Sequence, residues 1–298
     1  MALIVLVAGL LPYDSGKTWF TTSAALAARE KGLRVSVFKP VAAHNLWYSP
    51  RTVKKGLELG VLVGNDVLLY YENGLVGDLG VSNPVAIATV PPDPSKYSSI
   101  DSYMDDFGDV GRIAVISRVY DCGRGQRVHY VHAESLSKAG RWASRVIGRM
   151  LAAFKAEQRS FADLAGFLYS SSAVDNLDLC LKKLERESEV VFVESFSDAF
   201  TPYGVFLRSV GLIMLVAPGA VYVYTDVEGL WAAAEEAVRR IGVGGLQQQV
   251  RSTSRSTSTL PRNRSLSEAG TEENAQGIRG KGFNAEPYIT DGLRALQR

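Results

Sequence analysis

The chain has 298 residues, of which 46% are apolar, and its 33 basic and 31 acidic residues give a formal net charge of +2. A chain of this length and apolar content can bury a sizeable core, as one large domain or two small ones. A net charge so close to zero produces no overall basic field, so we expect no nucleic-acid partner.

The two cysteines, Cys122 and Cys180, fit a reducing compartment better than a disulfide scaffold. The apolar N-terminus lacks the basic flank and small-residue cleavage site of a signal peptide. A second apolar run, residues 210–224, is too short to span a bilayer and contains Pro218-Gly219. These features predict a soluble cytoplasmic α/β protein with no membrane partner.

The N-terminal stretch, residues 2–18, reads ALIVLVAGLLPYDSGKT. Residues 2–8 carry no charge, which predicts a strand buried on both faces, as in a parallel sheet. A loop then leads to Gly16-Lys17-Thr18, and an amphipathic run up to Gly32 predicts a helix. Strand, loop, Gly-Lys-Thr and helix in this order form the arrangement that cradles nucleotide phosphates.

In such a loop, backbone N–H groups and the helix N-terminus face the phosphate oxygens. Lys17 would reach the β- and γ-phosphates, and the Thr18 hydroxyl would ligate Mg²⁺. The loop is a variant, because Leu11 stands where the common G-x-x-x-x-G-K-[ST] motif has its first glycine. The alternative is a glycine-rich turn with a solvated lysine. The predicted ATP-binding residues are Asp14, Ser15, Gly16, Lys17 and Thr18.

Residues 33–41 predict a second strand, parallel to the first and joined to it by a right-handed crossover. Lys39-Pro40 lies at its C-terminal end, the edge where open α/β sheets bind ligands. Residues 51–62 predict a helix, and Gly64-Asn65-Asp66 leads into a short one. Asp66 is a candidate Mg²⁺ ligand; the alternative is an ordinary helix N-cap.

The middle of the chain is more irregular. Residues 82–94 are proline-rich and predict a substrate loop, and residues 113–121 and 127–132 predict a β-hairpin at a sheet edge. Residues 133–158 predict one long helix, whose Arg141, Arg145 and Arg149 form a basic face that we interpret as solvated. His129 and His132 would lie on opposite faces of a strand, so we expect no shared metal.

The C-terminal part begins with a predicted helix at 176–186, followed by strands at 189–194 and 212–217 and a helix at 226–241. From about residue 246 the chain is polar and rich in Ser, Thr, Gln and Arg. It cannot bury enough surface to offset its ordering entropy, so we expect a disordered tail over 246–298. Residues 1–245 are expected to form one P-loop nucleotide-binding domain, a mostly parallel sheet with helices on both faces.

Glu194 ends the apolar strand EVVFVE. Chemistry on Mg²⁺-nucleotides needs acidic groups to hold the metal and positive charge to stabilise the transferred phosphoryl group. A carboxylate at this position would lie near Thr18 if the two strands were neighbours; the alternative is a glutamate exposed at a strand end. The predicted metal ligands are therefore Thr18, Asp66 and Glu194.

In this order, the segments resemble the dethiobiotin synthetase family of P-loop enzymes, part of a group that includes the MinD-like ATPases and the cobyrinic acid amidases. The resemblance covers residues 2 to about 241. The loop at 15–18 matches the family's phosphate loop, and Lys39-Pro40-Val41 matches a Lys-Pro-Val whose lysine helps to bind substrate and phosphate. Asn65-Asp66 and Val193-Glu194 are similar to the segments whose acidic residues serve Mg²⁺.

Asn83-Pro84 is similar to the family's substrate loop, and Phe200-Thr201-Pro202 and residues 212–219 follow in the same order. The chain departs from the family at Ser195-Phe196-Ser197-Asp198, which replaces a glycine-rich stretch, and in its phosphate loop. It also has the polar tail where the family has a strand and an adenine-holding asparagine. The resemblance therefore implies the fold and the ATP–Mg²⁺ chemistry, but not dethiobiotin synthesis itself.

The leading hypothesis is an ATP-dependent enzyme that transfers the γ-phosphoryl group to a small carboxylate or carbamate. Lys17 and Lys39 are the catalytic candidates, which would stabilise charge on the phosphoryl group and acceptor. His44 and Asn45 would contact substrate or cap a loop. Because members of the family commonly pair, the resemblance also implies a homodimer.

Two alternatives stay open. One is a nucleotide-switched regulatory ATPase that binds a protein partner through its tail or its basic-faced helix. The other is a degenerate nucleotide binder that has lost its adenine site.

Overall fold

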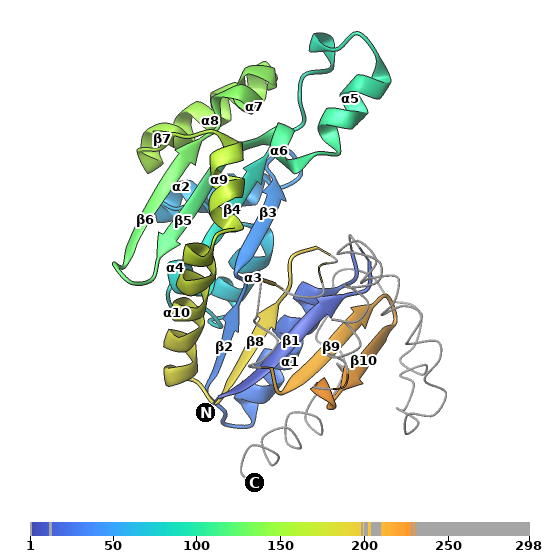
Figure 1. Ribbon diagram of the computed structural model, residues 1–298, viewed down its shortest axis with the longest axis vertical. Helices are drawn as coiled ribbons and strands as arrows, with labels where there is room; N and C mark the ends of the chain where they lie inside the picture. Colours follow the sequence, from blue (N-terminus) through green and yellow to red (C-terminus); the bar gives the residue numbers. More distant parts are fainter. Residues whose placement is uncertain are drawn as a thin grey trace. The chain divides into compact units, whose positions relative to one another are not determined.

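The computed structural model describes residues 2–11, 14–197, 199, 202–203, 210–227 and 229. The chain forms two compact units, one from Met1–Phe38 with Leu184–Arg298 and one from Lys39–Lys183 (Figure 1). Both units draw on the span that we expected to be a single domain. The predicted tail, and all but three residues of the helix predicted at 226–241, lie outside the described residues.

The first unit contains a five-stranded sheet of order β10-β9-β1-β8-β2 (Figure 1). The central strand β1 (Leu3–Gly9) is buried at every position, as its uncharged run predicted. It pairs in parallel with β8 (Val190–Glu194) and β9 (Leu212–Ala217), and β2 (Val35–Phe38) pairs in parallel with β8. At the other edge, β10 (Ala220–Tyr224) is antiparallel to β9.

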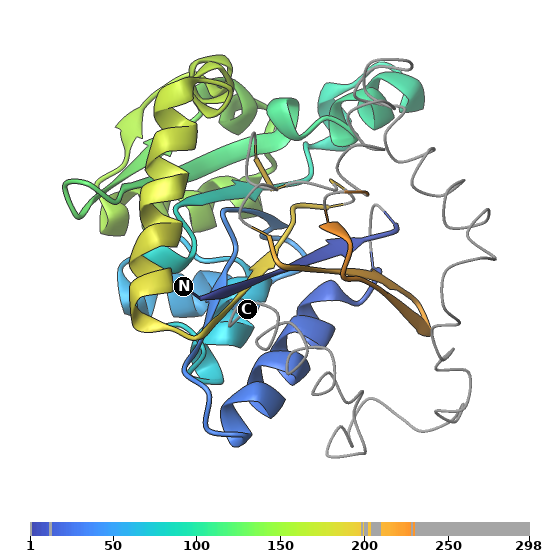
Figure 2. The same ribbon diagram turned by 60° about the horizontal axis from the view of Figure 1, so that its bottom comes forward.

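Helix α1 (Lys17–Glu30) runs along the sheet of the first unit and contacts four of its strands (Figure 2). Its buried positions include Phe20, Ala24, Ala25 and Ala28, the apolar stripe that a helical period of 3.6 residues places on one face. The helix ends before Gly32, whose φ of 84° is the left-handed conformation that glycine adopts at low cost.

The second unit contains another five-stranded sheet, of order β3-β4-β5-β6-β7. Its strands are β3 (Val41–Asn45), β4 (Val85–Thr89), β5 (Ala114–Asp121), β6 (Gln126–Val131) and β7 (Glu157–Gln158). β3 and β4 are parallel, β4 to β6 run antiparallel, and β7 adds a short parallel edge. The protein is therefore a mixed α/β structure with two sheets, rather than one mostly parallel sheet.

The second unit also contains helices, several of which are short. The helices are α2 (Pro50–Leu59), α3 (Asn65–Glu72), α4 (Leu79–Ser82), η1 (Pro94–Lys96), α5 (Ile100–Phe107), α6 (Val110–Ile113), α7 (Ala133–Lys138), α8 (Arg141–Phe154) and α9 (Phe161–Leu168). Helix α10 (Ser171–Glu187) begins in this unit and ends in the first. One core cluster packs α8 onto the sheet through Ala86, Ile116, Ile147 and Met150, among other residues, and Val53 and Leu57 of α2 pack against it.

Three predicted elements are divided differently in the structure. The strand predicted at 33–41 ends at Phe38, because Pro40 cannot donate a ladder hydrogen bond, and the chain then enters the second sheet as β3. The loop predicted at 82–94 contains strand β4, whose apolar residues are all buried between β3 and β5. The helix predicted at 133–158 breaks at Ala139-Gly140 into α7 and α8, and β7 follows.

Cys122 and Cys180 form a disulfide bond, with their Cα atoms 5.4 Å apart. The prediction from cysteine usage, that these residues are not part of a disulfide framework, is therefore wrong. The bond joins the turn between β5 and β6 to α10, across 58 residues of sequence. No helix among the described residues is long and apolar enough to cross a membrane.

Candidate functional site

Lys17 is the first residue of α1, and its ammonium group lies over the end of β1. Its Nζ donates hydrogen bonds to Ser15 Oγ at 3.1 Å and to the Ser197 carbonyl oxygen at 2.6 Å. A Cβ atom on Gly9 would lie 2.5 Å from both Lys17 Nζ and Ser15 Oγ. Glycine at position 9 is therefore what allows this lysine to approach the strand.

The backbone before α1 turns sharply. Asp14 and Gly16 have φ angles of 52° and 86°, both in the left-handed region. Gly16 is the N-cap of α1, and no side chain caps the helix. The first-turn N–H groups lie at the positive end of the helix dipole, a suitable arrangement for an anion such as phosphate. The predicted binding residues from Asp14 to Thr18 thus form a turn followed directly by a helix N-terminus.

Thr18 and Glu194 come together at the C-terminal ends of β1 and β8. The Thr18 hydroxyl donates a hydrogen bond to Glu194 Oε1 at 3.1 Å, and Glu194 is only 1% exposed. The two strands are parallel neighbours, with Glu194 opposite Val7. The exposed-glutamate alternative is therefore wrong. A hydroxyl and a carboxylate oxygen are hard donors that fit Mg²⁺, which takes one or two protein oxygens besides phosphates and water.

Lys39 and Asp66 form an ion pair in the second unit, with 3.2 Å between Lys39 Nζ and Asp66 Oδ2. The Lys39 side chain is buried at 4% exposure, while that of Asp66 is 37% exposed. Asp66 lies in the first turn of α3, but the N-cap is Gly64, so the capping interpretation of Asp66 is wrong. The predicted residues thus form two pairs, Thr18 with Glu194 and Lys39 with Asp66, each within its own unit.

Arg118, which sequence reasoning missed, supports the Lys39–Asp66 pair. It is fully buried on β5, and burial lowers its pKa to about 9. Its guanidinium donates to the Leu62 carbonyl oxygen at 2.9 Å, to Asn83 Oδ1 at 2.8 Å and to the Asn83 carbonyl oxygen. Asn83 Nδ2 in turn donates to the Lys39 carbonyl oxygen at 2.6 Å. The buried Arg118 side chain therefore holds in place the segments that carry Lys39 and Asp66.

Two consequences follow for the sequence predictions. Asn83, which the resemblance assigned to a substrate loop, is fully buried and its amide bonds only to the protein interior. The signal for Arg118 was visible as a charged residue within the apolar strand AVISRVYD, although nothing in the sequence named its partners.

His44 lies close to the Lys39–Asp66 pair. Both of its ring nitrogens are buried and form no hydrogen bond with any described residue, and its Nδ1 lies 3.3 Å from where a Cβ atom of Gly64 would be. Burial lowers the pKa of His44 to about 4, against the opposing effect of Asp66. The imidazole is therefore neutral near pH 7 beside the N-terminus of α3.

The other two histidines have structural partners. His129 Nε2 accepts a hydrogen bond from the Leu62 amide at 3.1 Å. His132 contacts the Arg159 carbonyl oxygen at 2.8 Å through Nδ1 and Ser117 Oγ at 3.0 Å through Nε2. The described part of the chain contains no cluster of three His, Cys, Asp or Glu side chains suited to a metal ion.

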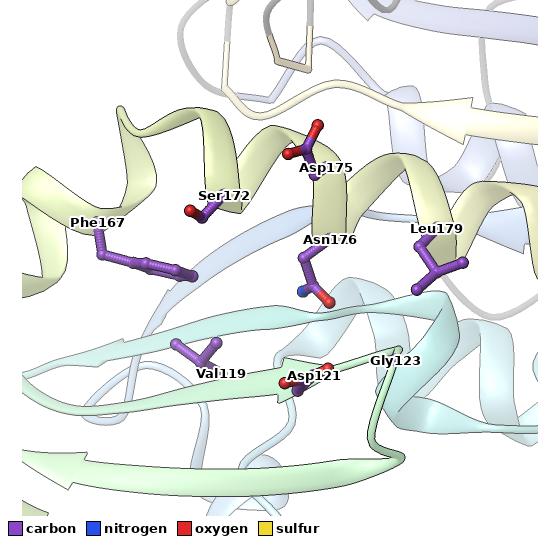
Figure 3. Close-up of a pocket in the computed structure, with 8 residues that line it drawn as sticks. All are labelled: Val119, Asp121, Gly123, Phe167, Ser172, Asp175, Asn176 and Leu179. Carbon is purple, nitrogen blue, oxygen red and sulfur yellow. The ribbon is translucent and has the colours of Figure 1, made fainter.

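A pocket of about 340 Å³ lies elsewhere in the second unit, between β5 and the helices α9 and α10 (Figure 3). Asn176 points from α10 toward β5 (Figure 3), where its amide bonds to the Tyr120 carbonyl and the Cys122 amide. None of the predicted site residues lines this pocket. Its lining residues are Val119, Asp121, Gly123, Phe167, Ser172, Asp175, Asn176 and Leu179.

Comparison with known proteins adds no relative: no protein-family model, curated protein or solved structure matches this chain.

Proposed function

We propose that this protein is a P-loop enzyme that binds Mg²⁺–ATP and transfers the γ-phosphoryl group to a small carboxylate or carbamate. The observation that carries the proposal is the contact of Thr18 with Glu194, directly beside the buried ammonium of Lys17. A hydroxyl, a carboxylate and a lysine at one helix N-terminus are the groups that hold a metal-bound nucleotide phosphate.

Each residue has a specific task in this proposal. The turn from Asp14 to Gly16 and the first N–H groups of α1 would bind phosphate oxygens. Lys17 would exchange its bonds to Ser15 and Ser197 for bonds to the β- and γ-phosphates. Thr18 and Glu194 would hold Mg²⁺, which when bound neutralises charge on the phosphates.

The remaining roles rest on the family resemblance. Lys39 would stabilise charge on the acceptor and the transferred phosphoryl group, and Asp66 would assist with Mg²⁺. An acceptor oxygen would attack the γ-phosphorus as the bond to the ADP oxygen breaks. A small-molecule substrate and a homodimer belong to the same proposal, whereas the Cys122–Cys180 disulfide bond removes the cysteine-based argument for a cytoplasmic location.

A steady-state ATPase assay with Mg²⁺ tests this function. We expect slow hydrolysis by the wild type that accelerates with small carboxylates and bicarbonate. Glu194→Gln should lower kcat at least a hundredfold, whereas Glu134→Gln, at an exposed site on α7, should leave it unchanged. A Glu194→Gln variant as active as the wild type would refute the metal assignment, and stimulation by a protein partner alone would favour the regulatory ATPase.

A further inference from the structure

Helix α8 presents a basic face to solvent. Its buried residues Ala143, Ile147 and Met150 mark the side that packs on the core. At about 100° per residue, the exposed Arg141, Arg145 and Arg149 all lie on the opposite side of the helix, and Trp142 lies next to them. The whole sequence of α8, RWASRVIGRMLAAF, contains no acidic residue.

Aromatic side chains continue this basic face. Trp142, 42% exposed, packs edge-on against Trp47, 56% exposed, with 5.1 Å between ring centroids. Tyr48, the next residue after Trp47, is 70% exposed. Exposed apolar rings that adjoin one another, unlike single exposed side chains, are typical of interaction surfaces. The arginine–tryptophan face is defined by Trp47, Tyr48, Arg141, Trp142, Arg145 and Arg149.

The arginines of this face form few contacts within the described part of the chain, although Arg141 lies close enough to Asp93 to help lower the pKa of that carboxyl. None of the three forms an ion pair or hydrogen bond with a described residue, whereas Arg51, Arg112 and Arg124 of the same unit pair with carboxylates. Solvated arginines alone would be ordinary surface. Combined with the exposed Trp47–Trp142 ring pair, whose Trp142 lies on the same helix, they provide positive charge next to aromatic surface.

We propose that the arginine–tryptophan face binds single-stranded nucleic acid. The arginines would contact phosphates, and the exposed aromatic rings would stack on bases, the combination used by proteins that bind single strands. The net charge of +2 does not oppose this, because the charge on α8 is local. Self-association through this face would place like charges opposite one another, which disfavours a second copy as the occupant.

The test measures fluorescence anisotropy of a labelled twenty-nucleotide oligo(dT) titrated with the full-length protein. We expect binding whose logarithmic affinity falls with the logarithm of salt concentration at a slope of about −2, from three phosphate contacts. Arg145→Glu/Arg149→Glu and, separately, Trp142→Ala should each weaken binding at least tenfold. The matched controls are Arg186→Glu on α10 and Trp19→Ala on α1, both exposed residues of the first unit.

Several outcomes would overturn the proposal. They are no binding by the wild type at low salt, unchanged binding by the Arg145→Glu/Arg149→Glu variant, and equal losses in the control variants. Displacement of the oligonucleotide by polyglutamate at equal charge concentration would indicate an acidic protein partner instead. Because none of these readouts involves ATP, failure here is separable from failure of the proposed enzyme function.

Discussion

Thr18 and Glu194 are 176 residues apart in sequence, yet the threonine hydroxyl donates a hydrogen bond to the glutamate carboxylate at 3.1 Å. The contact exists because β1 and β8 are parallel neighbours whose C-terminal ends coincide, and α1 starts directly after the loop from β1. This contact is the structural basis for the proposal of a metal-bound phosphate site at this end of the sheet.

Gly9→Ala should weaken the binding of Mg²⁺–ATP without unfolding the protein. The new Cβ atom would meet Lys17 Nζ and Ser15 Oγ at 2.5 Å, and both are movable ends of side chains, so the fold should persist while the lysine is displaced. We expect the affinity for Mg²⁺–ATP, measured by calorimetric titration, to fall at least tenfold. Gly148→Ala, an open position on α8, is the control and should not change affinity. Unchanged affinity in Gly9→Ala would contradict the assigned position of Lys17.

Arg118→Met should destabilise the second unit. The substitution leaves the Leu62 carbonyl oxygen and Asn83 Oδ1 without their donor. Each buried acceptor that loses its hydrogen bond lowers the free energy of unfolding by about 1–3 kcal/mol. Urea denaturation should show the loss, and hydrogen exchange should increase around Asn83. Arg127→Met, at an exposed site on β6, should have little effect. Equal stabilities for these two variants would show that Arg118 does not hold the segments together.

The protein should lose stability between pH 7 and pH 5. All three histidines lie in the second unit, and burial lowers their pKa values, to about 4 for His44 and about 3 for His129. Unfolded histidines bind protons below about pH 6.5, so the unfolded state takes up more protons in this window. The free energy of unfolding should fall by up to about 1.4 kcal/mol per pH unit per histidine.

Urea titrations at several pH values measure this slope. His44→Gln removes one of the titrating groups and should therefore reduce the slope. A pH-independent free energy of unfolding over this range would mean that the histidines are accessible in the folded protein.

Reduction of the Cys122–Cys180 bond should lower stability. The bond closes a loop of 58 residues, for which chain entropy predicts about 4 kcal/mol. Denaturation with and without dithiothreitol measures the difference, and a Cys122→Ser/Cys180→Ser variant should match the reduced protein. The account of the bond fails if both thiols of the non-reduced protein react with iodoacetamide in urea.

Prediction from the sequence succeeded for features that depend on a local pattern, and for residues at the C-terminal ends of neighbouring parallel strands. The uncharged run of β1 predicted its burial, and Lys17, Thr18 and Glu194 followed from loop chemistry and the meeting of parallel strand ends. Strand β4 was not predicted because prolines lie close to both ends of its five residues, VAIAT.

Other features depend on tertiary contacts that no local pattern encodes. The hydrogen-bond acceptors of Arg118 come from two separate segments, at Leu62 and at Asn83, and the two cysteines of the disulfide lie 58 residues apart. The step from β2 to β3, on either side of Lys39-Pro40, moves the chain from one sheet to another. Because residues 33–41 have high β-propensity along most of their length, the sequence pattern does not show that the chain changes sheets there.

The most direct test of the central claim is a calorimetric titration of Mg²⁺–ATP into the wild type and the Lys17→Ala variant, with Lys54→Ala, an exposed site on α2, as the control. The account predicts saturable binding by the wild type and the control, and at least a hundredfold weaker binding by Lys17→Ala with an unchanged circular dichroism spectrum. Equal affinity in all three proteins, or no binding by the wild type at millimolar ATP, would contradict it.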